Sequence, residues 1–337
     1  SNMLGFGKIA QVKELAPEKY PYLVDDAGEW TVRKDVRNVR VMCSGNKPAK
    51  DYLNDWMSAG TGIGNGKTIG PEIGIGYYVG EALDAPVLIL KACIGNRSLG
   101  WDLLPPGTKA YTIDGKTYAG YRGTGKEPEK TDATMADGWY AGCQYDGDTA
   151  ACKKVLANLG KYYPGATRYE VRGFCFWQGA KDGGNKGHQE AYEANLVRFI
   201  KALRKDFNAP DALFVCATMG HAKKGSKITD AQLAVDGRTG KYPEFRGNVA
   251  TFYSNPVSKG GSANGHYGGN GETYMNIGVG MGQTMAMLLK QNPSKSAEKK
   301  ADAPKPAKKP VAKKSKADRL LETAQSAEKM GQKDAAK

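Results

Sequence analysis

Residues 85–95 read APVLILKACIG, a run that is apolar almost throughout and ends at a glycine. A short continuous apolar run bounded by turn residues is typical of a strand that is buried on both faces. Its length is that of a strand rather than of a helix. Four further runs have the same character and are predicted to be strands: 37–43, 172–179, 212–220 and 247–254.

Segments with helical periodicity separate these predicted strands. The clearest is 188–207, HQEAYEANLVRFIKALRKDF, in which apolar residues recur at three- and four-residue spacing. Alternation of helices with strands that are apolar on both faces predicts an α/β fold, in which helices cover both faces of a mostly parallel sheet. Functional residues of such folds gather beyond the carboxyl ends of the strands. The other predicted helices are 72–83, 150–163 and 273–290.

The formal net charge of +14 is unevenly distributed along the 337 residues. Residues 291–337 hold 13 Lys and Arg against 6 Asp and Glu, and they contain no aromatic residue. This Lys/Ala/Pro-rich composition cannot bury enough apolar surface to fold, so we expect a disordered tail with one short terminal helix at most. Such a tail can bind acidic surfaces weakly, but it indicates no specific nucleic-acid site in the domain before it. That domain spans 1–290, and its polar, Gly-rich segment at about 104–138 is expected to be an insertion near the functional rim.

Several other classes of protein are not indicated by the sequence. No run of about 18 apolar residues is present, so we expect no membrane span. The stretch GTGIGNGKT (60–68) resembles a phosphate-binding loop, but Thr61 stands where that motif requires its first glycine. The six cysteines form no C-x-x-C pair, so a zinc site or a thioredoxin motif is not indicated. We expect no metal and no cofactor. Cys143 and Cys152 are the one candidate disulfide.

The three histidines are the candidate general bases. A hydrolase that works through serine needs a base near neutral pH, and histidine supplies it most often. His188 begins a predicted helix and is expected at the surface or as a helix cap. His221 follows the end of a predicted strand. His266 lies in the polar loop SANGHYGGNGETY directly before the last helix, where it can reach into a cleft, so we favour it over His221.

Two predicted strands end in groups that can donate hydrogen bonds to a developing oxyanion. Gly95 and Asn96 offer a backbone N–H and a side-chain amide at the end of the first strand quoted above. Gln178 offers an amide where the strand 172–179 breaks. The alternative is that Gln178 only ties down its loop. Amide donors from two strands at one rim suit acyl transfer, in which negative charge builds on a carbonyl oxygen.

Five blocks, found in order over roughly residues 1–290, resemble the sialate O-acetylesterase-like (SASA) esterases, carbohydrate esterase family 6 of the SGNH hydrolase superfamily. SNMLGFG at the start resembles the end of that family's G-Q-S-N-M nucleophile block. IGPEIGIGYYVGEAL is similar to its G-P-E segment, and ILKACIGNRSL to its I-K-x-A-x-G-G-x-S-L block. FCFWQGAKD resembles its W-x-Q-G-E-x-D block, and GHYGGNGETYMNIGVGMGQTMAMLL its histidine block and last helix.

The resemblance implies a flavodoxin-like three-layer α/β/α fold and the metal-free removal of O-acetyl groups from a carbohydrate. It assigns the nucleophile to Ser1 and the catalytic histidine to His266. It assigns the oxyanion donors to the Ser1 backbone N–H, the turn of Gly95 and Asn96, and Gln178. Serine attacks the acetyl carbonyl, an acetyl-enzyme forms, and the histidine then activates water.

The sequence departs from the family pattern at the third member of the catalytic triad. Ala263 stands where the family often has Asp, and Ala180 stands where it has the Glu of the W-x-Q-G-E block. Asp182 or Glu272 could orient His266 instead. A Ser-His dyad is a further alternative, and so is a catalytically silent carbohydrate-binding relative on the same fold.

The nucleophile block begins at the first residue of the sequence. We therefore expect the strand that precedes it in the family to be missing, and the chain as written to be unstable or inactive. Such enzymes often meet polysaccharides outside the cytoplasm, which favours a periplasmic or secreted location, with any signal peptide outside this sequence. The sugar, the position of its acetyl group and the oligomeric state are left open.

Overall fold

The computed structural model describes residues 2–123 and 139–294. Ser1, residues 124–138 of the predicted insertion and the predicted tail from residue 295 onward lie outside the described residues. Within them, all five predicted strands are confirmed. They are β2 (Arg33–Met42), β5 (Val87–Ala92), β8 (Gly173–Phe176), β9 (Leu213–Ala217) and β10 (Val249–Phe252).

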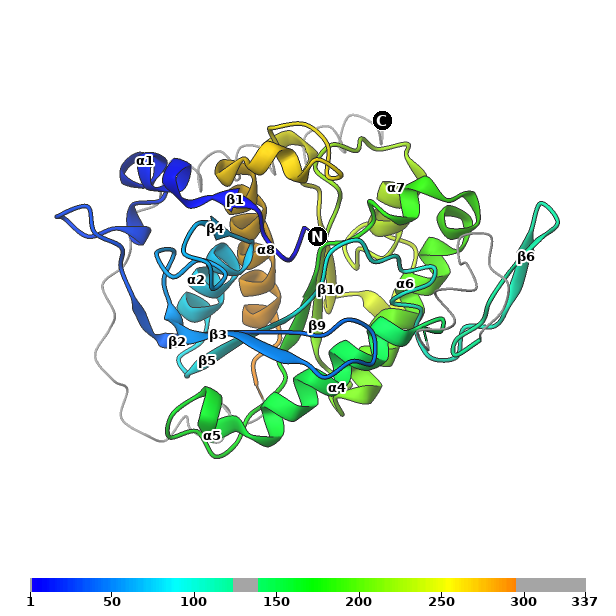
Figure 1. Ribbon diagram of the computed structural model, residues 1–337, viewed down its shortest axis with the longest axis horizontal. Helices are drawn as coiled ribbons and strands as arrows, with labels where there is room; N and C mark the ends of the chain where they lie inside the picture. Colours follow the sequence, from blue (N-terminus) through cyan, green and yellow to red (C-terminus); the bar gives the residue numbers. More distant parts are fainter. Residues whose placement is uncertain (1, 124–138, 295–337) are drawn as a thin grey trace.

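These strands form two three-stranded sheets rather than one (Figure 1). One sheet is parallel, in the order β10-β9-β8. The other has the order β3-β2-β5, in which β2 and β5 are parallel and β3 (Lys50–Met57) is an antiparallel edge strand. The pairs among the predicted strands are therefore all parallel, as predicted, but they belong to two sheets, of which β5 and β8 are end strands.

The four predicted helices are confirmed, except that the predicted helix 150–163 is found as two helices, the first of which begins at residue 143; two further helices lie within the described residues. The helices found where they were predicted are α2 (Glu72–Ala82), α4 (Cys143–Ala157), α5 (Leu159–Tyr162), α6 (Lys186–Asp206) and α8 (Gly271–Gln291). The two that were not predicted are α1 (Ile9–Lys19) and α7 (Lys227–Ala234). Short 3₁₀ turns lie at η1 (Pro21–Leu23), η2 (Asp182–Gly184), η3 (Pro243–Phe245), η4 (Asn255–Val257) and η5 (His266–Gly269).

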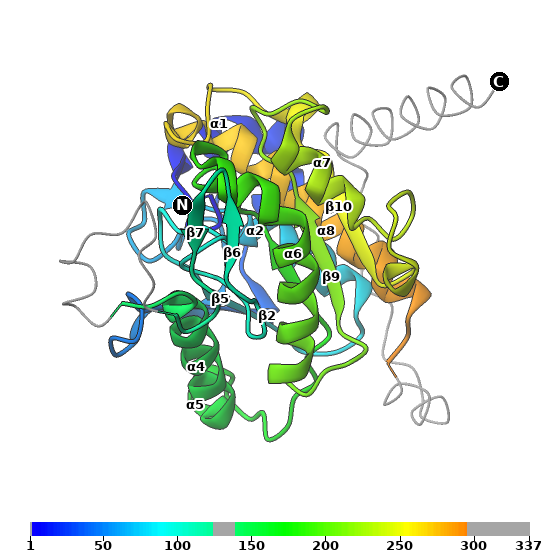
Figure 2. The ribbon, with the colours of Figure 1, turned by 90° about the vertical axis from the view of Figure 1, so that its right-hand side faces the viewer.

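The strands bury alternate residues on two faces, as the two-residue period of a strand requires. In β9, Leu213, Val215 and Ala217 belong to the core that also contains residues of α1, α2 and α8, whereas Phe214 and Cys216 belong to the core that contains residues of α6 and α7. Figure 2 shows α6 and α8 on either side of β9 and β10. The molecule therefore has the three layers of an α/β/α fold.

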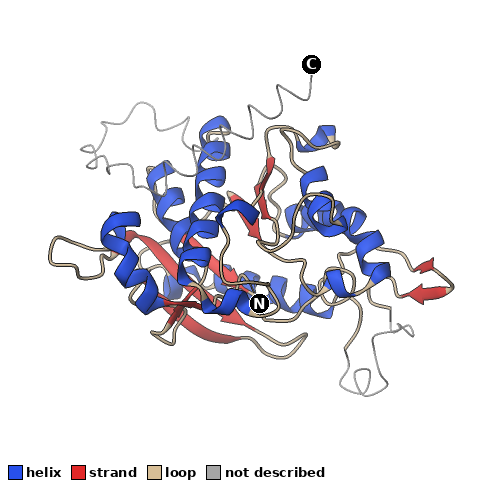
Figure 3. Cartoon of the chain, turned by 90° about the horizontal axis from the view of Figure 1, so that it is seen from above, coloured by secondary structure: helices blue, strands red, loops and turns tan. Residues whose placement is uncertain are grey.

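The second sheet is covered in the same way. Val39 and Val41 of β2 pack against α4 and against Tyr162 of α5. Val36, on the opposite face of β2, belongs to the core under α2 and α8. Figure 3 shows the strands lying between helices when the molecule is seen from above. The fold class predicted from the sequence is thus confirmed.

Helices α2 and α8 lie in backbone contact through glycines. A Cβ at Gly74 of α2 would lie 2.4 Å from the carbonyl carbon of Gly278 in α8. A Cβ at Gly282 would lie 2.6 Å from the carbonyl oxygen of Gly74. Because no side chain fits between them, the two helices hold a fixed position relative to each other.

Two short antiparallel strand pairs lie outside these two sheets. β6 (Tyr111–Ile113) and β7 (Lys116–Tyr118) form a hairpin within the predicted insertion and project from the body of the protein (Figures 1 and 3). β1 (Gly7–Lys8) pairs with β4 (Thr68–Ile69) and ties the start of the chain to the segment before α2.

Two other expectations concern cysteines and membranes. The candidate disulfide is wrong: Cys143 and Cys152 are both free and lie on the same helix, α4. Nine residues of helix separate them by about 13 Å, which a disulfide cannot span. Among the described residues, no helix has the length and apolar character needed to cross a membrane.

Candidate active site

The segment at the start of the chain lies across both sheets at the carboxyl ends of their strands. The Asn2 side chain is 4% exposed, and its Nδ2 donates a hydrogen bond to Sδ of Met219, just beyond β9, at 3.2 Å. The carbonyl of Leu4 accepts a hydrogen bond from Nζ of Lys91 in β5 at 3.1 Å. Ser1 itself lies outside the described residues. The block assigned to the nucleophile therefore lies where α/β folds place their functional residues.

The histidine loop contacts this segment directly. The imidazole of His266 stacks on the ring of Phe6, with centroids 4.0 Å apart and planes inclined by 12°. His266 is half-buried, and this burial lowers its pKa below the ordinary value. The lowered pKa favours the neutral ring, which is the form that can accept a proton. Within the described part of the chain, Nδ1 of His266 has no hydrogen-bond partner.

The backbone of the histidine loop makes a left-handed turn. His266 and Tyr267 have φ of 52° and 53°, and Gly268 and Gly269 continue with 60° and 72°. This conformation costs non-glycine residues about 1–2 kcal/mol each, so the surrounding structure must hold it in place.

Tyr267 is the residue that holds this turn. Its side chain is fully buried and stacks on Trp177, with centroids 5.6 Å apart. Its hydroxyl accepts a hydrogen bond from the backbone N–H of Gly220 at 3.0 Å. The turn that carries His266 is therefore fixed to the carboxyl ends of β8 and β9.

His221, the competing candidate, contacts the same loop. Its Nδ1 accepts a hydrogen bond from the backbone N–H of Ala263 at 3.2 Å, and its side chain is otherwise exposed. His221 thus contacts the loop three residues before His266. The two histidines therefore lie in one region: His266 stacks on Phe6, and His221 contacts the backbone of the loop that carries His266.

Gly95 and Asn96 follow β5 at the same rim. Asn96 is exposed and takes a left-handed φ of 56°. The amide of Gln178 does not extend into the rim, because Nε2 donates hydrogen bonds to the Arg97 carbonyl at 2.9 Å and to Oδ2 of Asp182 at 2.5 Å. Gln178 therefore ties the end of β8 both to the loop after β5, at Arg97, and to the segment that follows it, at Asp182.

Asp182 also binds the loop after β5, through hydrogen bonds from the backbone of that loop. It is fully buried, and its two oxygens accept the backbone N–H groups of Leu99 at 2.9 Å and Gly100 at 2.8 Å. Burial raises the pKa of Asp182. Nδ1 of His188 lies 3.7 Å from Oδ1 of Asp182. The structure thus places Asp182 beside His188 and the 97–100 loop, not beside His266.

His188 differs from its predicted surface position. It is fully buried, and the capping side chain of α6 is that of Asn185, which accepts the His188 backbone N–H at 3.0 Å. The polar sequence around His188 did not predict its burial, because the residues that cover its side chain come from segments distant in the sequence. One of them is Gly100, where an added Cβ would lie 2.4 Å from the imidazole.

Glu272, the other candidate acid, is paired with lysines. It begins the first turn of α8 and forms ion pairs with Lys19 and with Lys259, the latter at 2.9 Å. Burial alone would raise the pKa of Glu272, but the two lysines outweigh it and lower its pKa. Its described partners therefore do not include His266.

The described side chains form no cluster of potential metal ligands. In residues 2–123 and 139–294, no three His, Cys, Asp or Glu side chains are placed to hold a metal ion.

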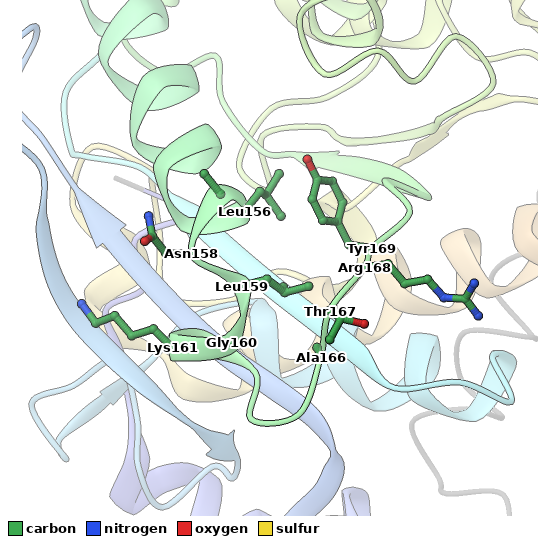
Figure 4. Close-up of a pocket in the computed structure, with 10 residues that line it drawn as sticks. Leu156, Asn158, Leu159, Gly160, Lys161, Ala166, Thr167, Arg168 and Tyr169 are labelled. Carbon is green, nitrogen blue, oxygen red and sulfur yellow. The ribbon is translucent and has the colours of Figure 1, made fainter.

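A separate pocket of about 560 Å³ lies at the opposite end of the strands. Figure 4 shows Leu156 and Leu159, from α4 and α5, on one side and Arg168 and Tyr169 on the other. These residues precede β8, whereas the candidate site lies beyond its carboxyl end. The pocket is therefore no part of the candidate site.

The fold and these contacts define an α/β protein in which a C-terminal histidine loop contacts an N-terminal block at the carboxyl ends of the strands. Residues 140–245 match the family described as carbohydrate esterase, sialic acid-specific acetylesterase (SASA). The match includes Gln178 and Asp182, while Gly95 and His266 lie outside it. The match agrees with the predicted resemblance over residues 140–245, which contain one of the five sequence blocks, FCFWQGAKD.

Two solved structures are similar to the chain at low sequence identity. One is a protein of Arabidopsis thaliana, 16% identical, with a TM-score of 0.44 over 76% of this chain and 82% of that one. The other is a carbohydrate acetylesterase from Xanthomonas citri, 11% identical, with a TM-score of 0.45 over 86% of this chain and 54% of that one. The similarity thus spans about half of the Xanthomonas enzyme. None of the curated proteins compared with the chain matches it.

Proposed function

We propose that this protein is a serine esterase that removes O-acetyl groups from a carbohydrate, with Ser1 as nucleophile and His266 as general base. The observation that carries the proposal is the stacking of His266 on Phe6 at 4.0 Å, which brings the histidine loop to the block that begins with Ser1. The SASA match supports the class of reaction and the acetylated carbohydrate substrate.

The mechanism requires one proton acceptor and one oxyanion site. Oγ of Ser1 attacks the acetyl carbonyl carbon while Nε2 of His266 takes the hydroxyl proton. The negative charge on the carbonyl oxygen is stabilised by donors at Gly95 and Asn96. The tetrahedral intermediate then expels the sugar oxygen, which takes the proton back from His266. Water repeats the sequence on the acetyl-enzyme and releases acetate.

We assign Gln178 and Asp182 to positioning rather than to direct contact with the substrate. Both amide hydrogens of Gln178 are donated within the protein, to Arg97 and Asp182. Asp182 in turn accepts the backbone N–H groups of Leu99 and Gly100. Together they fix the loop after β5, whose first residues provide the oxyanion donors.

The imidazole works as part of a Ser-His dyad in this proposal. Asp182 is occupied by the 97–100 loop and Glu272 by two lysines, so neither supplies the third member of a triad. The ring of His266 is oriented by its stacking on Phe6 and by the fixed turn through Tyr267.

One observation favours a second candidate, a catalytically silent carbohydrate-binding relative. Ala180 and Ala263 replace the acidic residues that the family resemblance leads one to expect, and Nδ1 of His266 has no partner among the described residues. Such a protein would bind the sugar without forming an acetyl-enzyme.

Hydrolysis of p-nitrophenyl acetate by the full chain and its variants tests the proposal. In this test the parent is the protein together with any residues that precede Ser1. We expect turnover in that parent and a loss of about 10³-fold or more in kcat for both Ser1→Ala and His266→Ala, since the residues of such a unit act together. Lys161→Ala, in the pocket at the other end of the strands, is the matched control and keeps the parent kcat. A folded parent that binds acetylated sugar without turnover would establish the silent relative instead.

A further inference from the structure

A buried ion pair lies directly beneath the N-terminal block. Nζ of Lys91 is 2.8 Å from Oε2 of Glu72, and the two side chains are 4% and 1% exposed. Taking both charges out of water costs several kcal/mol for each ion, so a pair of apolar residues would serve stability as well or better. Stability alone therefore does not explain why two charged residues are buried here.

The contacts of this pair point to the N-terminal block. Nζ of Lys91 also donates a charge-assisted hydrogen bond to the carbonyl of Leu4 at 3.1 Å. Oε1 of Glu72 accepts the backbone N–H of Gly70 at 3.1 Å. Gly5 has a φ of 96°, and a Cβ there would lie 2.5 Å from the Cα of Gly70. Residues 4 and 5 are thus packed against the Glu72–Lys91 pair and the turn before α2.

The same pair connects the other parts of the candidate site. Lys91 lies in β5, four residues before Gly95, so the strand that contacts Leu4 also ends in the proposed oxyanion donors. Glu72 begins α2, which is in backbone contact with α8 through Gly74. Helix α8 directly follows the histidine loop. One ion pair thus joins the elements that carry the nucleophile block, the oxyanion loop and the base.

We propose that Lys91 and Glu72 are positioning residues, which fix the N-terminal block relative to the loop after β5 by holding the Leu4 carbonyl. The proposal rests on the proposed function for its effect on catalysis. A displacement of the nucleophile by about 1 Å costs on the order of 100-fold in rate even when it arises away from the chemistry.

The test separates positioning from stability with two variants of the full chain. Lys91→Met leaves Glu72 buried without its partner, so both Tm and kcat fall. The double variant Lys91→Met/Glu72→Met removes both charges and regains Tm, because an apolar pair replaces the ions. We expect its kcat for p-nitrophenyl acetate to stay about 30-fold or more below the parent, with KM changed less than threefold, because the Leu4 carbonyl has lost its donor. Recovery of kcat together with Tm would overturn the proposal.

Arg33→Met is the matched control for loss of an ion pair. Arg33 pairs with Asp35 at 2.6 Å and with Glu81 at 2.7 Å, on the amino-terminal part of β2 and away from the candidate site. We expect its Tm to fall while its kcat stays within twofold of the parent. Lys91→Arg keeps the charge and the donors and is expected to keep the N-terminal block in place.

Hydrogen exchange of the peptide that contains residues 2–8 decides the proposal even if the parent hydrolyses nothing. The amides of this segment should lose protection in the double variant and keep it in Arg33→Met and Lys91→Arg. Unchanged protection in the double variant would overturn the positioning role. Absence of turnover in the parent, with this loss of protection still observed, would overturn the proposed function alone.

Discussion

His266 combines a stacked ring with a lowered pKa, and this has a measurable consequence for the pH dependence of activity. A general base must be neutral to accept a proton, so its activity appears as pH rises through its pKa. Burial places the pKa of His266 below the ordinary value of about 6.5. The Phe6 ring is the described neighbour that stacks on the imidazole.

We expect the acid limb of kcat/KM for p-nitrophenyl acetate to have its midpoint below pH 6.5. Phe6→Ala exposes the imidazole, raises its pKa toward the ordinary value and moves the midpoint to higher pH. Phe6→Tyr keeps the stacked ring and is expected to keep the parent midpoint. A midpoint that is the same in Phe6→Ala and in the parent would show that burial against Phe6 does not set this pKa.

At the scale of the element, the contact between α2 and α8 depends on glycine. A Cβ at Gly74 would lie 2.4 Å from the backbone of Gly278, and backbone atoms cannot move aside as the end of a flexible side chain can. Gly74→Ala is therefore expected to lower the free energy of unfolding by about 3 kcal/mol, since overpacking forces backbone shifts. Guanidinium denaturation measures it.

Gly160→Ala is the matched control for this change. The nearest atom to a Cβ at Gly160, in the short helix α5, is 3.9 Å away. Alanine there replaces a poor helix former without a clash, so stability should stay equal to the parent or rise by up to about 1 kcal/mol. Equal losses in the two variants would show that the α2–α8 contact tolerates a side chain.

The elements that the sequence predicted and those it missed differ in a physical way. The strands β5 and β9 are apolar on both faces because helices cover both, so their composition alone identifies them. The edge strand β3 is polar and largely exposed along its length, which protects an edge from pairing with another chain but hides it from an apolar pattern. Helix α7 has only eight residues, too few to show a clear helical period.

The positions of the candidate site residues differ in the same way in how far the sequence predicts them. Gly95 and Asn96 stand where an apolar strand ends, and His266 lies in the polar loop directly before the last helix, positions that are typical of the rim of such a fold. The roles of Gln178 and Asp182 depend on which backbone groups they meet across the fold, and a linear pattern does not contain that information. The buried pair of Lys91 and Glu72 was hidden for the same reason: each residue alone looks like an ordinary charged residue in a strand or at a helix start.

At the scale of the whole molecule, one carboxylate in helix α4 affects the pH dependence of stability. Asp148 is partly buried, and this burial raises its pKa to about 6, although Nε2 of Gln144 donates a hydrogen bond to it at 2.8 Å. An unfolded Asp has a pKa of about 3.9. Because the folded value is the higher one, ionisation of Asp148 opposes folding: its contribution is most favourable below pH 4, declines between pH 4 and pH 6, and stays low above pH 6.

Asp148→Asn removes this ionisation and keeps an oxygen that accepts from Gln144. A difference of about two pKa units corresponds to about 3 kcal/mol, so we expect the variant to be more stable than the parent by up to about 3 kcal/mol at pH 8, with the difference nearly gone at pH 4. Thermal unfolding at the two pH values measures it. If Asp148→Asn is more stable than the parent by the same amount at both pH values, the gain comes from packing rather than from removal of the charge.

The contact of Phe6 with His266 has a consequence for the order in which the protein matures. Its two rings come from opposite ends of the described chain, so their meeting depends on nearly all of the intervening structure. Contacts between residues so distant in sequence form late, because a long loop must close first. During synthesis the N-terminal block emerges from the ribosome long before the histidine loop and α8. On the proposed function, a nascent chain therefore carries its nucleophile without its base, and it stays inert toward cellular esters until the final helix has docked.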